Sequence, residues 1–258
     1  MKIKWYGAAS LVIESEGARI ALDPYVNRNP SLPRMKPEDL KGVDGVLVTH
    51  GHFDHTADLP YLINNSSIPV YASQETFEAL SSVSEFAEVN LKPAVPEKPI
   101  VSGALTCIPY PASHVRFDIP LIIKTLAGII PSLIKRSEPL MRIKSDFLKY
   151  PMGSTIAWEI RSSDRSVLVF GSMGFAEGQE YPSTNLLVLP LQGHSSIHKM
   201  AVQAAVRIKP SAVMAFHFDD SFPPVSSSID TGKFVKMMSL QMPQAGVFIP
   251  SYGEEILI

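Results

Sequence analysis

The sequence of 258 residues contains one cysteine, Cys107, so a framework of intrachain disulfides is excluded. Its formal net charge is −2, which creates no field that would recruit nucleic acid or an anionic membrane surface. Residues 1–6 lack the apolar stretch of a signal peptide, and no run reaches the length of a membrane span. These absences predict a cytoplasmic protein that acts on a small molecule rather than on nucleic acid.

Hydrophobic residues make up 45% of the chain, which is enough for one large core or for two fused halves. No internal repeat, linker or low-complexity tract divides it, so we expect a single domain over residues 1–258. Strands alternate with helices in the expected pattern, which is typical of an α/β fold. The expected strands include Lys2–Trp5, 11–14, 19–22, 46–48, Val70–Ala72, 100–109, 186–191 and Ala212–Phe216, and the expected helices include 57–64, Gln74–Ser81, 197–209 and 229–239.

Three of the seven histidines lie within six residues, in the segment Thr49-His50-Gly51-His52-Phe53-Asp54-His55. The segment leaves the apolar strand 46–48, and residues two apart in an extended chain point the same way. The imidazoles of His50 and His52 can therefore face one cation, while Asp54 and His55 can face a second cation nearby. Imidazole nitrogen with carboxylate oxygen is the ligand set of zinc or a similar divalent metal such as Mn²⁺. The segment predicts a metal site.

Further candidates follow other strands, at the strand ends where ligands gather in open α/β architectures. His114 and His217 each come directly after a predicted strand, and we expect both to join the site. His194 also follows a strand, as a helix cap or as a group that contacts substrate. Asp23 follows the third strand, either as an ordinary turn residue or as a carboxylate that orients a metal-binding histidine.

Residues 118–151 break the pattern and predict a helical insertion. The segment Ile119–Ile134 is very apolar with Lys124 as its one charge, and Pro131 is expected to interrupt any helix there. Residues 118–150 contain six Lys or Arg against three Asp or Glu. The insertion either packs on the main body or forms a lid over the site, a contact for a homo-oligomer, or a patch for an apolar substrate. We expect residues 119–134 to be mostly helical and to cover apolar surface near the mouth of the site.

The histidine and aspartate signature, together with His114 and His217, resembles the metallo-β-lactamase superfamily. The segments Lys4-Trp5-Tyr6-Gly7-Ala8-Ala9-Ser10 and Leu22-Asp23-Pro24 are similar to its branch of small metal-dependent hydrolases, which includes ascorbate-6-phosphate lactonase-like proteins. The resemblance implies a four-layer αββα sandwich with one or two zinc ions at one edge. It also implies two ligand groups, His50, His52 and His114 for one metal and Asp54, His55 and His217 for the other.

One position departs from the superfamily's pattern, in which an aspartate after a strand bridges both metals. The matching segment here reads Phe170-Gly171-Ser172-Met173-Gly174, so Ser172 occupies the bridging position. A neutral hydroxyl brings no charge, and the six remaining ligands supply one negative charge against two dications. Glu177 and Glu180 are the nearby carboxylates, and both are expected to be solvated.

The leading hypothesis is a metal-dependent hydrolase that attacks a phosphoester, lactone or amide with a metal-activated water. Asp54 would orient the nucleophile or take its proton. The alternative is a metal- or ligand-binding protein of the same fold whose catalysis is impaired by Ser172.

Overall fold

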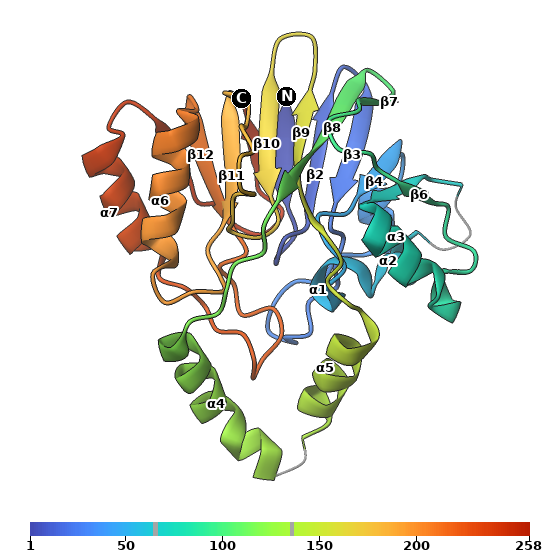
Figure 1. The fold of residues 1–258 in the computed structure, drawn as a ribbon, viewed down its shortest axis with the longest axis vertical. Helices are drawn as coiled ribbons and strands as arrows, with labels where there is room; N and C mark the ends of the chain where they lie inside the picture. Colours follow the sequence, from blue (N-terminus) through green and yellow to red (C-terminus); the bar gives the residue numbers. More distant parts are fainter. Residues whose placement is uncertain (64–66, 135–136) are drawn as a thin grey trace.

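A computed structural model of the chain describes residues 1–63, 67–134 and 137–258. Two β-sheets of seven strands each pack face to face, and helices cover their outer faces (Figure 1). The layers therefore follow the order helix, sheet, sheet, helix, and the four-layer αββα sandwich expected from the sequence is confirmed. In the described residues, no helix has the length and apolar character needed to cross a bilayer.

The first sheet has the spatial order β14-β1-β2-β3-β4-β5-β6 and the second has the order β13-β12-β11-β10-β9-β8-β7. The strands of the first sheet are β1 (Lys2–Trp5), β2 (Leu11–Ser15), β3 (Ala18–Leu22), β4 (Gly45–Leu47), β5 (Val70–Ala72), β6 (Leu91–Pro93) and β14 (Glu255–Leu257). The strands of the second sheet are β7 (Ile100–Ser102), β8 (Leu105–Ala112), β9 (Thr155–Arg161), β10 (Ser166–Phe170), β11 (Leu186–Pro190), β12 (Ala212–Phe216) and β13 (Gly246–Phe248).

The helices are short on one side of the sandwich and longer on the other. They are α1 (Phe53–Thr56), α2 (Leu59–Leu62), α3 (Gln74–Ser81), α4 (Ile119–Ile134), α5 (Glu138–Lys149), α6 (Ile197–Ile208) and α7 (Thr231–Gln241), with 3₁₀ turns η1 (Pro37–Leu40) and η2 (Ser84–Phe86). Helix α3 begins where expected, because the Ser73 hydroxyl accepts a hydrogen bond from the Thr76 N–H.

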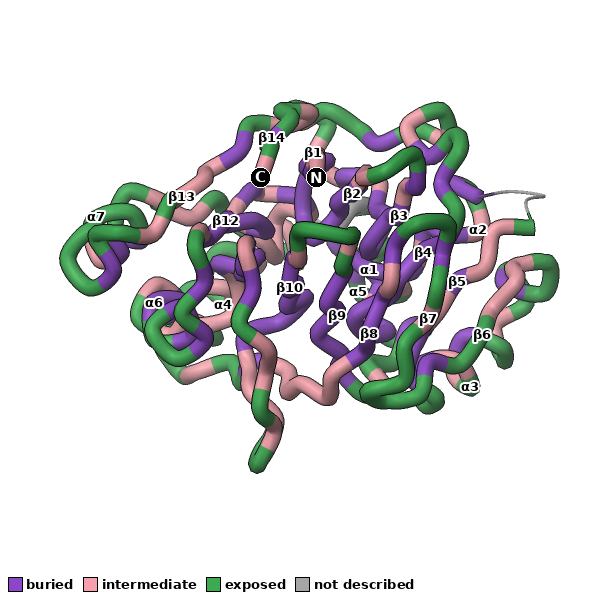
Figure 2. Tube along the Cα trace, turned by 90° about the horizontal axis from the view of Figure 1, so that it is seen from above, coloured by how far each residue is buried: buried purple, intermediate pink, exposed green. Residues whose placement is uncertain are grey.

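Successive side chains of each strand point to opposite faces of its sheet, and this alternation divides the core into layers. Val167 and Val169 of β10 point between the sheets, where Trp158 and the apolar residues of β1 to β3 also pack. Leu168 and Phe170 point to the opposite face, against the buried faces of α6 and α7. In Figure 2 the strands form a buried band with exposed helices and loops on either side. Burial on both faces explains why these strands read as continuous apolar runs.

Helices α4 and α5 project together from one edge of the sandwich, opposite the edge where both chain ends lie (Figure 1). The expected helix over Ile119–Ile134 is confirmed, but the expectation that Pro131 interrupts it is wrong. A proline removes one backbone hydrogen bond, here to the carbonyl of Ala127. Ala127 is exposed, so water can bond to that carbonyl and the helix continues.

Two other expectations need correction. The helix expected at 57–64 is shorter, ending at Leu62, and a separate turn, α1, begins earlier at Phe53. The last residue of that expectation, at position 64, lies outside the described residues. Strand β6 was not expected, because Leu91–Pro93 ends in a proline and carries no apolar alternation.

A buried hydrogen bond connects the two sheets just before the histidine segment. The indole N–H of Trp158 donates to the carbonyl oxygen of Val48 at 3.0 Å. We expect Trp158→Phe to lower the free energy of unfolding by about 1–3 kcal/mol, because it leaves that buried carbonyl unpaired. Urea unfolding in the presence of a chelator measures the difference without stabilisation by bound metal. A decrease in the free energy of unfolding of less than about 0.5 kcal/mol would contradict this prediction.

Candidate metal centre

The structure brings His50, His52 and His114 together from two different sheets. His50 and His52 lie in the loop that leaves β4, and His114 follows β8. The ring centroids of His50 and His52 are 4.8 Å apart, and that of His114 is 5.0 Å from His50 and 4.8 Å from His52. One nitrogen from each ring lies within 4.8 Å of the others, so the three could hold a metal ion.

A second group adjoins the first and consists of Asp54, His55 and His217. Its three potential ligand atoms also lie within 4.8 Å of one another, and all three residues are buried. The Oδ2 atom of Asp54 is 3.2 Å from Nε2 of His217 and 3.5 Å from Nε2 of His55. The rings of His50 and His55 lie 3.9 Å apart, so the two groups are neighbours within one site.

Asp23 orients this second group. Its carboxylate accepts hydrogen bonds from the Thr49 backbone N–H at 2.8 Å and from the Thr49 hydroxyl at 2.6 Å. The same carboxylate lies 2.7 Å from Nδ1 of His55. That contact places the ring proton on Nδ1 and leaves Nε2 of His55 free to face Asp54. Of the two alternatives for Asp23, the structure therefore favours the orienting carboxylate.

His114 is oriented by a chain of contacts that begins at Ser172. The Ser172 hydroxyl accepts a hydrogen bond from the Val115 N–H at 3.0 Å. Nδ1 of His114 donates to the Val115 carbonyl at 2.8 Å, which leaves Nε2 to face His50 and His52. Ser172 thus anchors the segment that carries His114. No local sequence pattern indicates this role, because 57 positions separate Ser172 from Val115.

Burial keeps the first group neutral, which is the form in which imidazole binds metals. Burial lowers the pKa of His50 well below its usual value, and the neighbouring histidines reinforce that effect. Burial also lowers the pKa of His52 to about 4, although Asp54 opposes it. Burial likewise lowers the pKa of His114, against the opposing effect of its bond to the Val115 carbonyl.

The second group contains the one candidate ligand that is an ionised carboxylate. Burial opposes protonation of His55, but the carboxylates of Asp23 and Asp54 outweigh it and raise its pKa. Burial opposes ionisation of Asp54, but His55 and the hydrogen bond from His217 outweigh it and lower the pKa of the carboxyl group. Asp54 is therefore ionised at neutral pH. It supplies the single negative charge among the six candidate ligands.

The donor set fits a divalent cation of borderline softness. Nε2 of His50 and Nδ1 of His52 are 3.1 Å apart. Both rings are neutral, so each has one nitrogen lone pair that can bind a metal. Nδ1 of His217 is buried without a hydrogen-bond partner in the described residues. Clustered imidazoles with unsatisfied nitrogens are the ligands that zinc and related metals prefer.

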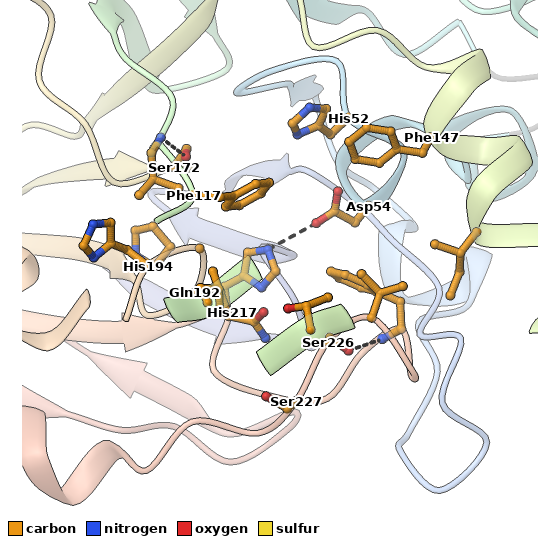
Figure 3. Close-up of a pocket in the computed structure, with 18 of the residues that line it drawn as sticks. His52, Asp54, Phe117, Phe147, Ser172, Gln192, His194, His217, Ser226 and Ser227 are labelled. Atoms are coloured by element: carbon orange, nitrogen blue, oxygen red, sulfur yellow. Dashed lines mark hydrogen bonds and ion pairs between the residues drawn. The ribbon is translucent and has the colours of Figure 1, made fainter. Parts of the chain in front are cut away.

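The two groups open into a cavity of about 410 Å³. Ser172 and His194 line it, as does Gln192, which the sequence did not single out. Phe117 and Phe147 also line the cavity beside the first group, as the close-up shows (Figure 3). The ring of Phe147 stacks on His52 at 5.5 Å, and the ring of Phe117 lies 6.0 Å from that of His114. Phe147 belongs to the insertion and Phe117 directly precedes it. Their place in the chain was the one feature of the sequence that pointed to a position near the mouth of the site.

Glu177, Glu180 and His194 were weighed as residues near the ligands. Glu177 and Glu180 are exposed and do not line the cavity, in agreement with the expectation that they are solvated. His198, four residues after His194, does not line the cavity either and bonds to the Asp230 carbonyl between α6 and α7. Nδ1 of His194 accepts a hydrogen bond from the Ser196 N–H just before α6, and His194 also lines the cavity. Contact of His194 with substrate stays a prediction.

Comparison with known proteins agrees with this geometry. A family model described as the β-lactamase superfamily domain matches residues 18–218. The chain belongs to the metallo-β-lactamase superfamily. It is similar to a UPF0173 metal-dependent hydrolase of Pyrococcus abyssi, with 26% identity over 99% of both chains. It is also similar to a UPF0173 metal-dependent hydrolase of Myxococcus xanthus, with 28% identity over 98% of this chain and 81% of the relative.

Among solved structures, the fold resembles Igni18, described as a novel metallo hydrolase from Ignicoccus hospitalis. The TM-score is 0.68 at 21% identity, and the match covers 99% of this chain and 97% of the other. The superfamily and fold expected from the sequence are thus confirmed. The resemblance of this superfamily member to ascorbate-6-phosphate lactonase-like proteins stays a prediction.

Replacing Asp23 by Asn tests whether its carboxylate sets the tautomer of His55. An amide group facing Thr49 and His55 would present a donor to Nδ1, which would move the ring proton to Nε2. We expect the second group to bind a divalent metal about 10- to 100-fold more weakly in Asp23→Asn. Titration with Zn²⁺ after chelation measures the change.

Glu159→Gln is the matched control, because Glu159 is a buried carboxylate bonded to Tyr110 and Arg161 away from the cavity. Its metal affinity should equal that of the native protein. Equal affinities in Asp23→Asn and the native protein would rule out the orienting role.

Proposed function

We propose that this superfamily member is a metal-dependent hydrolase that cleaves a small substrate with a metal-activated water. His50, His52 and His114 would hold one divalent ion, with zinc as the first candidate. Asp54, His55 and His217 would hold a second ion. The observation that carries the proposal is the convergence of six potential ligands, from segments far apart in the chain, at the floor of one cavity.

A bound divalent ion supplies a hydroxide at neutral pH and polarises the oxygen of the bond under attack. The protein's own contribution is orientation and charge. Asp54 faces the cavity and is ionised, so its carboxylate can accept a hydrogen bond from an attacking water and orient it. Its contact with His217 fixes the carboxylate in that position. Phe117 and Phe147 lie beside the first group but are each 53% exposed, so they shield it from bulk water only in part.

The bond to be cleaved belongs to a lactone, an amide or a phosphoester, since each has a carbonyl or phosphoryl oxygen that a divalent ion polarises. Names of the curated relatives support hydrolysis as the reaction class. The ligand set supports a divalent ion without distinguishing zinc from manganese by itself. The alternative is a protein that binds metal or ligand without turnover. Its support is the neutral hydroxyl of Ser172 at the position where a bridging carboxylate is expected.

Ser172 leaves the two metal positions unequal. A bridging carboxylate would give charge to both cations, whereas the Ser172 hydroxyl is neutral and is used to anchor Val115. The first group can hold one dication with three histidines and leave a position open for water, as catalytic zinc sites do. We infer one tightly bound ion at the first group and a weaker, exchangeable ion at the second.

Metal removal tests the reaction class. Chelation should abolish cleavage of generic esters, lactones and phosphodiesters, and added Zn²⁺ or Mn²⁺ should restore it. Replacing His114 by Ala should lower kcat/KM by about 100-fold or more, because it removes a ligand of the tighter ion. Initial rates with the chelated, reloaded and variant proteins measure this. Turnover that survives complete metal removal would refute the metal-dependent mechanism, and bound metal without any turnover would favour the impaired alternative.

Replacing Ser172 by Asp tests the inequality of the two ions. One carboxylate oxygen can keep the hydrogen bond from Val115 while the other faces the cations, so affinity for the second ion should rise. Ser172→Ala is the matched control, because it removes the bond without adding charge. Metal stoichiometry by titration at one pH distinguishes the three proteins. Two equally tight equivalents in the native protein would show that Ser172 does not weaken the second position.

A further inference from the structure

The cavity extends well beyond the candidate ligands, and its outer walls are apolar. One wall is α4, a second consists of Ile143 and Phe147 of α5, and a third is the loop at 222–229. Gly128 of α4 lies opposite Pro224 of that loop. The lining runs along α4 from Leu121 to Gly128, which corresponds to about 10 Å of helix. The space is an elongated slot that begins at the histidines.

The apolar residues of α4 that line the cavity adjoin apolar residues that do not. Leu121, Ile122 and Leu126 line the cavity, and residues 122 and 126 are one helical turn apart. Ile119 and Ile123 lie beside Ile122 and Leu126 on the helix surface, but they do not line the cavity and are 73% and 62% exposed. Ile122 and Leu126 are still 44% and 54% exposed in the structure, so part of their apolar surface faces the cavity without cover. A ligand in the slot would remove that surface from water.

Charge is scarce along the slot. Among the described lining residues, Lys124 is the one with an amine or guanidinium group, and it is exposed. The polar lining away from the candidate ligands includes the hydroxyl group of Thr125. It also includes those of Ser226 and Ser227, which are labelled in Figure 3. A phosphate-bearing or sugar-like group placed there would lose water without gaining charged partners. The slot is suited to an uncharged hydrocarbon group.

We propose that the substrate is an acyl ester, lactone or amide with an extended hydrocarbon chain, which lies between α4, α5 and the 222–229 loop. This inference rests on the proposed hydrolase function, since it places the scissile carbonyl at the histidines. Cleavage breaks the bond between the acyl carbon and the leaving oxygen or nitrogen. Water supplies the new oxygen on the acyl carbon and a proton to the leaving group, so no other reactant is needed.

The first experiment measures binding without turnover. Fluorescence of the neutral probe N-phenyl-1-naphthylamine reports its binding to the native protein, both loaded with Zn²⁺ and chelated. The test variant I122Q/L126Q places amides on the cavity face of α4. The control I119Q/I123Q makes the same changes, with the same spacing, at two neighbouring positions that do not line the cavity. Glutamine has good helix propensity, so both variants should fold. Probe affinity should fall about tenfold in the test variant alone.

The second experiment measures kcat/KM for p-nitrophenyl esters from acetate to decanoate, below their micelle concentrations. In the native protein kcat/KM should rise about two- to fourfold per added methylene until the slot is filled. The test variant should lose about tenfold on the decanoyl ester and nothing on the acetyl ester. The control variant should match the native protein throughout.

The outcomes separate this inference from the function on which it rests. Metal-dependent cleavage that is independent of chain length overturns the hydrocarbon substrate and leaves the hydrolase intact. Probe binding that is equal in both variants also overturns it. Loss of probe binding in the test variant alone, with no ester, lactone, amide or phosphodiester cleaved by any form, supports the apolar slot while refuting the hydrolase.

Discussion

One buried carboxylate, that of Asp23, organises the site. Asp23 lies at the end of β3 with a φ of 41°, and it is 1% exposed. Through Thr49 it ties the end of β3 to the loop that leaves β4, and through His55 it sets the protonation of a candidate ligand. A buried carboxylate is stable only with such partners, so the loop and the carboxylate hold each other in place.

The rest of the site depends on the packing of the two sheets. The first sheet supplies the segment from His50 to His55, while the second supplies His114 and His217. Contact across the sheets is close, because a side chain at Gly171 would collide with that of Thr49. The adjacent Ser172 then fixes the segment that bears His114. Any substitution that shifts one sheet against the other therefore also shifts one set of ligands against the other.

The sequence predicted candidate site residues where a metal-binding residue type lies directly beyond an apolar strand. Histidines just beyond apolar strands predicted the groups that the structure brings together, because strand ends meet at one edge of a sheet. The role of Asp23 stayed open, since its partners are 26 and 32 positions away. Phe117 and Phe147 acquire their roles only when the insertion folds over the histidines, so no local pattern identifies them. The prediction that Pro131 interrupts the helix was wrong, because the energetic cost of a proline in a helix depends on whether water can bond to the carbonyl that loses its N–H partner.

The cavity wall and the metal ligands come from separable parts of the chain. Most of the wall is one continuous segment, whose start is tied to the body by bonds from Ser195 to Asp118 and whose end is tied by Gly51 to Met152. Both attachments lie beside the histidines, so residues between them can change in length or composition while the ligands keep their places. Substitutions, insertions or deletions in this one segment can therefore change the substrate range of the enzyme during evolution without changing its metal ligands.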